Sequence, residues 1–113
     1  SLKKPIIIPA LKLKKIKKDY KKVKIFDYGV TLKNNTFSSY KNYSVLPHNL
    51  TFGYAIAVAL SGKAKNITIA GFDGYKKNQL QQIEMEKTIS LIIKNYPRLK
   101  LRSLTKTNYP LIK

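Results

Sequence analysis

The sequence predicts an α/β fold in which helices cover a mainly parallel sheet. Its 113 residues allow one domain and little more. At 43% hydrophobic and 11% aromatic residues, the chain can bury a real core, which excludes a disordered basic tail. From residue 46 onward, helical and strand patterns alternate with short connections. Strands that alternate with helices favour a parallel sheet with right-handed crossovers.

The first half of the chain supplies two predicted strands. Residues 5–9 are a short β-branched run between prolines and are predicted as a buried strand. Residues 11–16 carry apolar side chains among lysines, which indicates a short helix or a turn. Residues 23–30 alternate loosely and give the second strand. Residues 33–44 are polar and aromatic and contain an Asn-Asn turn signal, so they are predicted as a loop and a candidate lid.

The clearest helix of the sequence spans residues 52–60. These residues are apolar nearly all round, which is typical of a buried helix. Asn49 or Thr51 is expected to cap its start, and Gly62 is expected to end it in the C′ position. A strand is predicted next, over residues 66–72.

A second, amphipathic helix is predicted over residues 79–95. Its apolar stripe consists of Leu80, Ile83, Met85, Ile89, Ile92 and Ile93. Pro97 marks the end of the helix. Residues 99–104 alternate as a last strand, and residues 105–113 form a polar, partly extended tail. We treat residues 3–113 as one domain and Ser1-Leu2 as a remnant of expression.

The rare residue types exclude several kinds of chemistry. The chain has no Cys, which removes disulfides, thiolate metal sites and cysteine nucleophiles. His48 is the only His, so a two-histidine metal site is excluded and a single imidazole is left for acid–base work. We expect neither a metal nor a cofactor in this domain. No apolar run reaches the roughly 18 residues that span a bilayer and no signal peptide opens the sequence, so a cytoplasmic location is predicted.

The formal net charge of +18 favours an anionic partner. Arg, whose planar fork suits bases and phosphates, supplies only two of the 23 cations, and no nucleic-acid-binding motif is present. Nucleic acid is therefore not the favoured partner. Lysines concentrate over residues 12–24, and a solvated, lysine-coated surface is the preferred interpretation of that run. A phosphorylated sugar, a nucleotide, a nucleic acid or a membrane surface is the alternative.

The carboxyl ends of parallel strands mark where a ligand is expected to bind. The strand over residues 66–72 leads into Gly71, Asp73, Gly74 and Tyr75. Asp73 is expected to project into the crevice, between glycines that let a ligand approach the backbone. A carboxylate there can accept hydrogen bonds from sugar hydroxyls. Equally, it can cap its own loop by accepting from backbone N–H groups.

The start of the helix over residues 52–60 is a second candidate site. A helix N-terminus offers unpaired N–H groups to a phosphate or carboxylate, and Asn49 and Thr51 would add side-chain bonds. Ordinary capping needs the same residues and is the more common use. His48 precedes them and is the one candidate base, although no orienting partner is evident in the sequence.

Neutral hydrogen-bonding groups follow the last strand. The groups that suit a sugar or a nucleobase are Ser103, Thr105, Thr107 and Tyr109, although a plain polar loop explains each of them as well. Thr105 and Thr107 are the two that we expect to contact the ligand. Glu84 and Glu86 are two residues apart on a helix, so they do not face each other as a glycosidase pair would. The Gly-rich dinucleotide fingerprint and the P-loop pattern are both absent.

Three motifs carry a resemblance to a known family. They are Leu-Pro-His-Asn-Leu-Thr-Phe-Gly-Tyr at residues 46–54, Ala-Gly-Phe-Asp-Gly-Tyr at 70–75 and Ser-Leu-Thr-Lys-Thr-Asn-Tyr at 103–109, where Lys106 replaces a usual Pro. They resemble the C-terminal Rossmann-like domain of bacterial HMG-CoA-lyase-like (HMGL-like) aldolases, which tend to occur among surface-polysaccharide genes. The resemblance implies a small Rossmann-like three-layer domain, an N-terminal aldolase-like barrel as partner, and a parent protein that is an aldolase or lyase.

The block from the helix to Tyr75 is also similar to part of bacterial sialyltransferases and MptE-like domains. In the sialyltransferases this region helps to build a CMP-sugar site, and a catalytic His follows the Gly-x-Asp-x-Tyr block. No His follows Asp73 in this chain. That departure argues against transferase activity.

These observations lead to one functional prediction and two alternatives. The chain is predicted to be an accessory domain that binds an anionic sugar or nucleotide-sugar, or docks on the catalytic barrel, in polysaccharide biosynthesis, and is not itself catalytic. One alternative is a minimal nucleotide-sugar-dependent glycosyltransferase-like enzyme. The other is a Lys-rich nucleic-acid-binding module. An exposed sheet edge also allows a homodimer.

Overall fold

The structure, a computed structural model, describes residues 5–9, 24–110 and 112 and confirms a mixed α/β fold. The strands are β1 (Ile6–Ile8), β2 (Ile25–Asp27), β3 (Gly29–Leu32), β4 (Ser38–Ser39), β5 (Tyr43–Leu46), β6 (Asn66–Ile69) and β7 (Lys100–Ser103). The helices are α2 (Thr51–Ser61) and α3 (Leu80–Asn95). The helix or turn predicted over residues 11–16 lies outside the described residues, as does most of the lysine-rich run.

The described strands form three small sheets. β1 pairs with β2 in parallel, with Ile6 opposite Ile25. β5 lies between β3, to which it is parallel, and β4, to which it is antiparallel. β6 and β7 form a separate parallel pair, with Asn66 opposite Lys100, and α3 connects the two strands. Three of these four pairings are parallel, and α3 supplies the crossover that the parallel β6–β7 pair requires.

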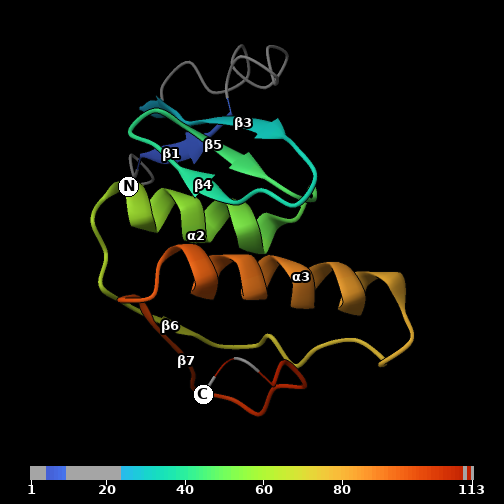
Figure 1. The fold of residues 1–113 in the computed structure, drawn as a ribbon. Helices are drawn as coiled ribbons and strands as arrows, with labels where there is room; N and C mark the ends of the chain where they lie inside the picture. The colour runs from blue at the N-terminus through green and yellow to red at the C-terminus, as the bar shows by residue number, and fades with distance from the viewer. Residues whose placement is uncertain (1–4, 10–23, 111, 113) are drawn as a thin grey trace.

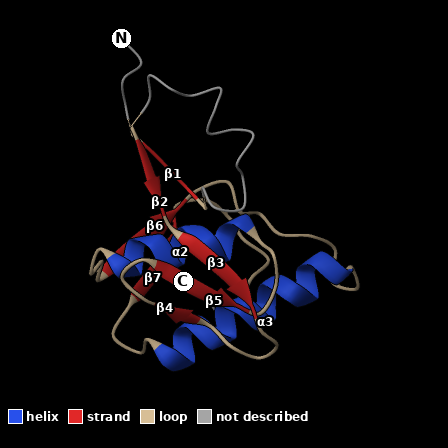
Figure 2. Cartoon of the chain, turned by 90° about the horizontal axis from the view of Figure 1, so that it is seen from above, coloured by secondary structure: helices blue, strands red, loops and turns tan. Residues whose placement is uncertain are grey.

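The predicted strand over residues 23–30 is divided between two partners. Only Tyr28 separates β2 from β3, and its N–H donates to the Ile8 carbonyl oxygen at 3.0 Å. Immediately afterwards, the Gly29 N–H donates to the Asn42 carbonyl oxygen at 2.9 Å. The run thus leaves β1 and continues along β5. Figure 2 shows β3 and β5 lying next to each other above α2.

Residues 33–44 contain more regular structure than the predicted loop. They include β4 and the first two residues of β5. Phe37 and Ser44 are fully buried, and the Ser44 hydroxyl donates to the Gly29 carbonyl oxygen at 3.1 Å. The Ser39 hydroxyl likewise donates to the Ala57 carbonyl oxygen of α2. Such partners far along the chain allow polar residues in a buried sheet, and composition alone does not indicate them.

α2 packs between the β3–β5–β4 sheet and α3, as Figure 1 shows, and β6 and β7 lie on the other side of α3. Phe52, Ile56 and Ala57 of α2 are buried. A Cβ atom placed on Gly53 would come 3.4 Å from Thr88 Cγ2 of α3 and 3.7 Å from Leu46 Cδ2 of β5. These are ordinary van der Waals distances, so α2 packs closely against both α3 and β5 at this point.

α3 buries a narrower stripe than the sequence predicts. Met85, Ile89 and Ile92 are buried, whereas Leu80, Ile83 and Ile93 remain exposed. Two polar residues, Gln82 and Thr88, take their places in the core. In the described part of the chain, neither helix is long and apolar enough to cross a membrane.

α2 ends one residue later than its sequence suggests. Gly62 has φ −85°, and the residue in the left-handed conformation is Lys63, with φ +64°. The Lys63 N–H donates to the Leu60 carbonyl oxygen and the Ala64 N–H to that of Ala59. This is a Schellman motif with Lys63, not Gly62, at C′. The prediction that Gly62 occupies C′ is therefore wrong.

Candidate functional site

The start of α2 has no side chain bonded to it. The N-cap residue is Leu50, whose side chain cannot accept a hydrogen bond, and the first turn contains no acidic residue. Asn49 and Thr51 flank Leu50, are exposed, and make no side-chain hydrogen bond with any described residue. The expected cap by Asn49 or Thr51 is therefore not formed, and the first N–H groups of α2 remain available.

The loop after β6 meets the segment after β7. The Gly71 N–H donates to Thr105 Oγ1 at 3.1 Å, and the Asn108 N–H donates to the Asp73 carbonyl oxygen at 2.7 Å. Gly74 has φ +105°, and a Cβ atom there would lie 2.8 Å from the Cβ atom of Asn108. Only glycine accommodates both this backbone conformation and this approach.

Gln82 of α3 ties the two segments to the helix. Its Oε1 accepts a hydrogen bond from the Tyr75 N–H at 2.8 Å. Its Nε2 donates to Glu86 Oε1 at 3.2 Å and to the Asn108 carbonyl oxygen at 3.4 Å. The side chain is only 1% exposed, so these bonds form inside the protein. The sequence offered one clue to this role, namely that a Gln stands on the buried face of the helix, three residues before Met85.

A cavity of about 250 Å³ lies where these elements converge. Its lining residues are Asn49, Leu50, Thr51, Phe52, Phe72, Tyr75, Met85 and Tyr109. Phe52 and Phe72 pack edge to face, with ring centroids 5.2 Å apart. The cavity thus combines the uncapped start of α2 with aromatic side chains from the two loop segments. A water molecule in the liquid occupies about 30 Å³, so the cavity is several times larger than one water and has room for a small ligand.

Three of the predicted site residues line this cavity: Asn49, Thr51 and Tyr75. The other five are not among its lining residues. Gly71, Asp73, Gly74 and Thr105 shape the loops through the backbone contacts described above. Thr107 Oγ1 accepts a hydrogen bond from the Tyr109 N–H at 3.2 Å and so holds that residue beside the cavity.

Apolar residues make up the part of the lining that was not predicted. Phe52 and Met85 belong to predicted helices, but their sequence spacing does not distinguish a core position from a cavity wall. Phe72 lies inside the motif at residues 70–75, which was the one available signal that it belongs to the site. Tyr109, which the sequence indicates as a hydrogen-bonding group after the last strand, also lines the cavity.

His48 lies next to Asn49 but is not among the cavity's lining residues. Its Nδ1 is 4.0 Å from Glu84 Oε1 on α3. Both side chains are about one quarter exposed, at 27% and 26%. The structure thus supplies a carboxylate neighbour for His48 that the sequence did not reveal, at a distance longer than a hydrogen bond.

Two tyrosines near this end of α2 hold their protons more tightly than usual. Burial is the main cause that raises the pKa of Tyr109, and Tyr75 and Glu86 add to it. Burial, followed by Asp27 and Tyr28, raises the pKa of Tyr54 to about 12. Tyr109 lines the cavity, and its hydroxyl stays protonated to a higher pH than that of an exposed tyrosine. Among the described residues, no cluster of three or more His, Asp or Glu side chains could hold a metal ion.

Comparison with known proteins found no matching family model, curated protein or solved structure. The resemblance carried by the motifs at residues 46–54, 70–75 and 103–109 therefore stays a prediction.

Proposed function

We propose that this domain binds an anionic sugar in the cavity at the start of α2. The observation that carries the proposal is that one cavity joins an uncapped helix N-terminus to aromatic side chains, Phe72, Tyr75 and Tyr109. The acidic group would accept hydrogen bonds from the first N–H groups of α2. The sugar ring would lie against the aromatic side chains.

The charges around α2 favour an anion at this point. Its first turn carries no acidic residue. Such a residue would itself interact with the positive end of the helix dipole and would repel an anionic ligand. The side chains of Asn49 and Thr51 are free to add hydrogen bonds. The net charge of +18 attracts anions to the protein as a whole.

The size of the cavity selects among anionic ligands. Pockets that enclose a drug-sized ligand measure roughly 300–1,000 Å³. A cavity of about 250 Å³ falls below this range and suits one sugar ring with its acidic group. A nucleotide-sugar would leave one of its halves outside. We therefore favour a sugar acid or sugar phosphate over a complete nucleotide-sugar.

The broader role follows from the resemblance. We propose a Rossmann-like accessory domain that acts beside an aldolase-like barrel in polysaccharide biosynthesis. The parallel β6–α3–β7 unit supports the Rossmann-like part of this proposal. The meeting of the 70–75 and 103–109 motifs beside one cavity supports the ligand-binding part.

A glycosyltransferase-like activity is the second candidate, favoured by the neighbouring pair His48 and Glu84. A carboxylate that approaches Nδ1 can orient an imidazole for proton transfer. This candidate predicts slow release of nucleotide from CMP- or UDP-sugars, abolished by His48→Gln. Under the binding proposal, His48→Gln leaves sugar-acid binding within about twofold of the parent, because a residue outside the lining contributes little.

The binding proposal is tested by a thermal-shift titration with sialic acid and glucose 6-phosphate, with glucose as the neutral control. A ligand at 100 times its Kd stabilises the fold by about 2.7 kcal/mol. Thr51→Glu places a negative charge at the start of α2, where it stabilises the helix by about 0.3–1 kcal/mol but repels an anionic ligand. We expect the variant to stay folded and to lose the ligand-induced shift.

The matched control is Gln81→Glu, the same change of charge in the first turn of α3 at an exposed residue outside the cavity lining. It should retain the shift. The proposal is wrong if no acidic sugar shifts the parent, if glucose shifts it equally, or if the two Glu variants behave alike.

A further inference from the structure

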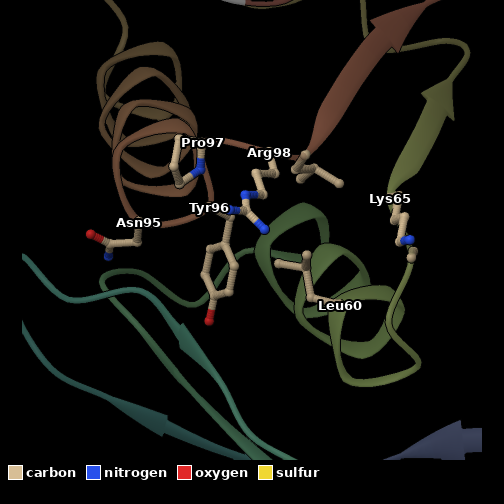
Figure 3. Close-up of a pocket in the computed structure, with 8 residues that line it drawn as sticks. Leu60, Lys65, Asn95, Tyr96, Pro97 and Arg98 are labelled. Atoms are coloured by element: carbon tan, nitrogen blue, oxygen red, sulfur yellow. The ribbon is translucent and has the colours of Figure 1, made fainter.

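A second hollow of about 310 Å³ lies at the opposite ends of the two helices, where α2 and α3 end and β6 and β7 begin (Figure 3). The residues labelled in the figure as lining it are Leu60, Lys65, Asn95, Tyr96, Pro97 and Arg98. Its volume reaches the lower end of the range for small-ligand pockets. The sequence did not indicate a site here, because the ligand was expected at the other edge of the strands.

The two stretches around this hollow carry positive charge and no acidic residue. They are residues 58–66 and 91–100, which contain no Asp or Glu. Their cations are Lys63, Lys65, Lys94, Arg98 and Lys100. In the described part of the chain, neither Lys65 nor Arg98 is paired with a carboxylate. Two unpaired cations therefore border a mainly apolar hollow.

Among the residues that the structure describes, no side-chain hydrogen bond joins Lys65 or Arg98 to the C-terminus of either helix. The last carbonyl groups of a helix carry partial negative charge, which a nearby cation can offset. Here the carbonyl oxygens of Val58, Ala59 and Leu60 already accept hydrogen bonds from the turn that follows α2. At the end of α3, the Tyr96 N–H donates to the Ile92 carbonyl oxygen at 2.8 Å. Lys65 and Arg98 are thus available for a ligand.

One wall of the hollow is held rigidly. The Tyr96 hydroxyl accepts a hydrogen bond from the Ser39 N–H at 2.8 Å, and its ring packs edge to face against Phe37. The neighbouring Asn95 Nδ2 donates to the Phe37 carbonyl oxygen at 2.9 Å. Figure 3 shows the Arg98 side chain extending beside Tyr96 toward Leu60. A fixed wall lowers the entropy lost when a ligand binds.

We propose that this hollow binds an organic anion, with a carboxylate, sulfonate or phosphate group on a flat apolar ring. The planar guanidinium of Arg98 would hold the acidic group, and Lys65 would add a second positive charge. The ring would lie against Tyr96, Leu60 and Pro97. This site is separate from the cavity at the start of α2, and the proposal does not depend on the one made for that cavity.

The test uses 8-anilinonaphthalene-1-sulfonate, an anion on an aromatic body whose fluorescence rises on binding. We expect saturable binding by the parent and at least about tenfold weaker binding by the double variant Lys65→Gln/Arg98→Gln, because charge-assisted hydrogen bonds are lost. The matched control is Lys33→Gln/Arg102→Gln, which removes two exposed cations outside the hollow. It should bind within about twofold of the parent. Equal binding by the parent and the double variant, or equal loss in the control, overturns the proposal.

Two further measurements separate this site from nonspecific dye binding. N-phenyl-1-naphthylamine has the same ring system without the sulfonate, and we expect it to bind weakly and with no response to the Lys65 and Arg98 changes. In ¹⁵N spectra of the unmodified protein, the sulfonate should shift the amide signals of Lys65, Tyr96 and Arg98 and leave those of α2's first turn in place. Tight binding of the neutral compound, or shifts confined to the first turn, contradicts the proposal even if a variant fails to fold.

Discussion

Gln82 is the residue that holds the candidate sugar site together. Its buried amide bonds the Tyr75 N–H on one side and the Asn108 carbonyl oxygen on the other. Removing the amide would leave backbone groups of both loops without a partner. A buried polar group without a partner costs about 1–3 kcal/mol, which exceeds the average net gain of a single hydrogen bond.

We predict that Gln82→Met lowers the free energy of unfolding by about 1–3 kcal/mol, measured by urea denaturation. Met keeps the length and flexibility of the side chain, so the change isolates the hydrogen bonds. Gln81→Met, one residue away and exposed, should change stability by less than about 0.5 kcal/mol. Similar values for the two variants would mean that the loops do not depend on the buried amide.

Tyr54 gives the chain a pH-dependent stability at alkaline pH. Burial raises its pKa from 10.0 to about 12, so the folded state binds the phenolic proton more tightly than the unfolded state does. Its contribution is fully present below pH 10 and is lost as the pH rises through about 12. The raised pKa of Tyr109 acts in the same direction.

We predict that absorbance titration of the folded protein shows a phenolate that forms only near pH 12 and disappears in Tyr54→Phe. The hydroxyl of Tyr54 donates to the Tyr28 carbonyl oxygen, so the variant should also be less stable at neutral pH, by about 1 kcal/mol. Tyr40→Phe, at an exposed tyrosine, serves as the control. If Tyr54→Phe leaves the last step of the titration unchanged, another tyrosine has the raised pKa.

At the scale of single elements, the structure and the sequence prediction differ in how α2 ends. The sequence favours Gly62 as the left-handed residue, whereas the structure gives Lys63 that conformation. A left-handed lysine costs roughly 1 kcal/mol relative to glycine. A Cβ atom on Gly62 would approach no closer than 3.5 Å, to the Ala59 carbonyl oxygen, which is an ordinary contact.

We therefore predict that Lys63→Gly stabilises the protein by up to about 1 kcal/mol and that Gly62→Ala is neutral or stabilising, both measured as unfolding free energies. The opposite ranking would follow if Gly62 were the left-handed residue. A loss of about 1 kcal/mol or more in Gly62→Ala would show that the helix ends as the sequence suggested.

The sequence predicted the long periodic elements well. α2 was expected at residues 52–60 and spans Thr51–Ser61, and α3 was expected at residues 79–95 and spans Leu80–Asn95. Helical spacing and the position of Pro97 are local signals, so a single chain suffices to find them. β4 and β5 were missed in part because the hydroxyls of Ser39 and Ser44 bond to backbone groups far along the chain, in α2 and β3, which local composition does not encode.

The candidate site was predictable at the level of segments but not of individual side chains. Topology places the starts of both helices and the 70–75 loop at the same edge, and Figure 1 shows this arrangement. Which residues turn toward the cavity depends on tertiary contacts. The Asp73 backbone bonds Asn108, whereas Tyr75 turns toward the cavity, and no sequence pattern separates the two.

At the scale of the whole molecule, the two ends of the helix pair have different chemistry. The end at which α2 and α3 begin carries the aromatic cavity, and Asp73, Glu84 and Glu86 belong to the loop and helix around it. The opposite end carries five cations and no acidic residue within residues 58–66 and 91–100. An anion drawn by the overall charge alone would favour the opposite end. Binding at the first end therefore requires the specific contacts of the cavity.

The most direct test of the sugar-binding proposal is a titration of the ¹⁵N-labelled chain with sialic acid, followed in ¹H–¹⁵N spectra. We predict saturable shifts of the amide signals of Thr51, Phe52 and Gly53 at the start of α2, and of Tyr75 in the adjoining loop. An equal concentration of glucose should leave those signals unmoved. Absence of shifts at these four amides, or shifts limited to the basic end around Lys65 and Arg98, would contradict the account.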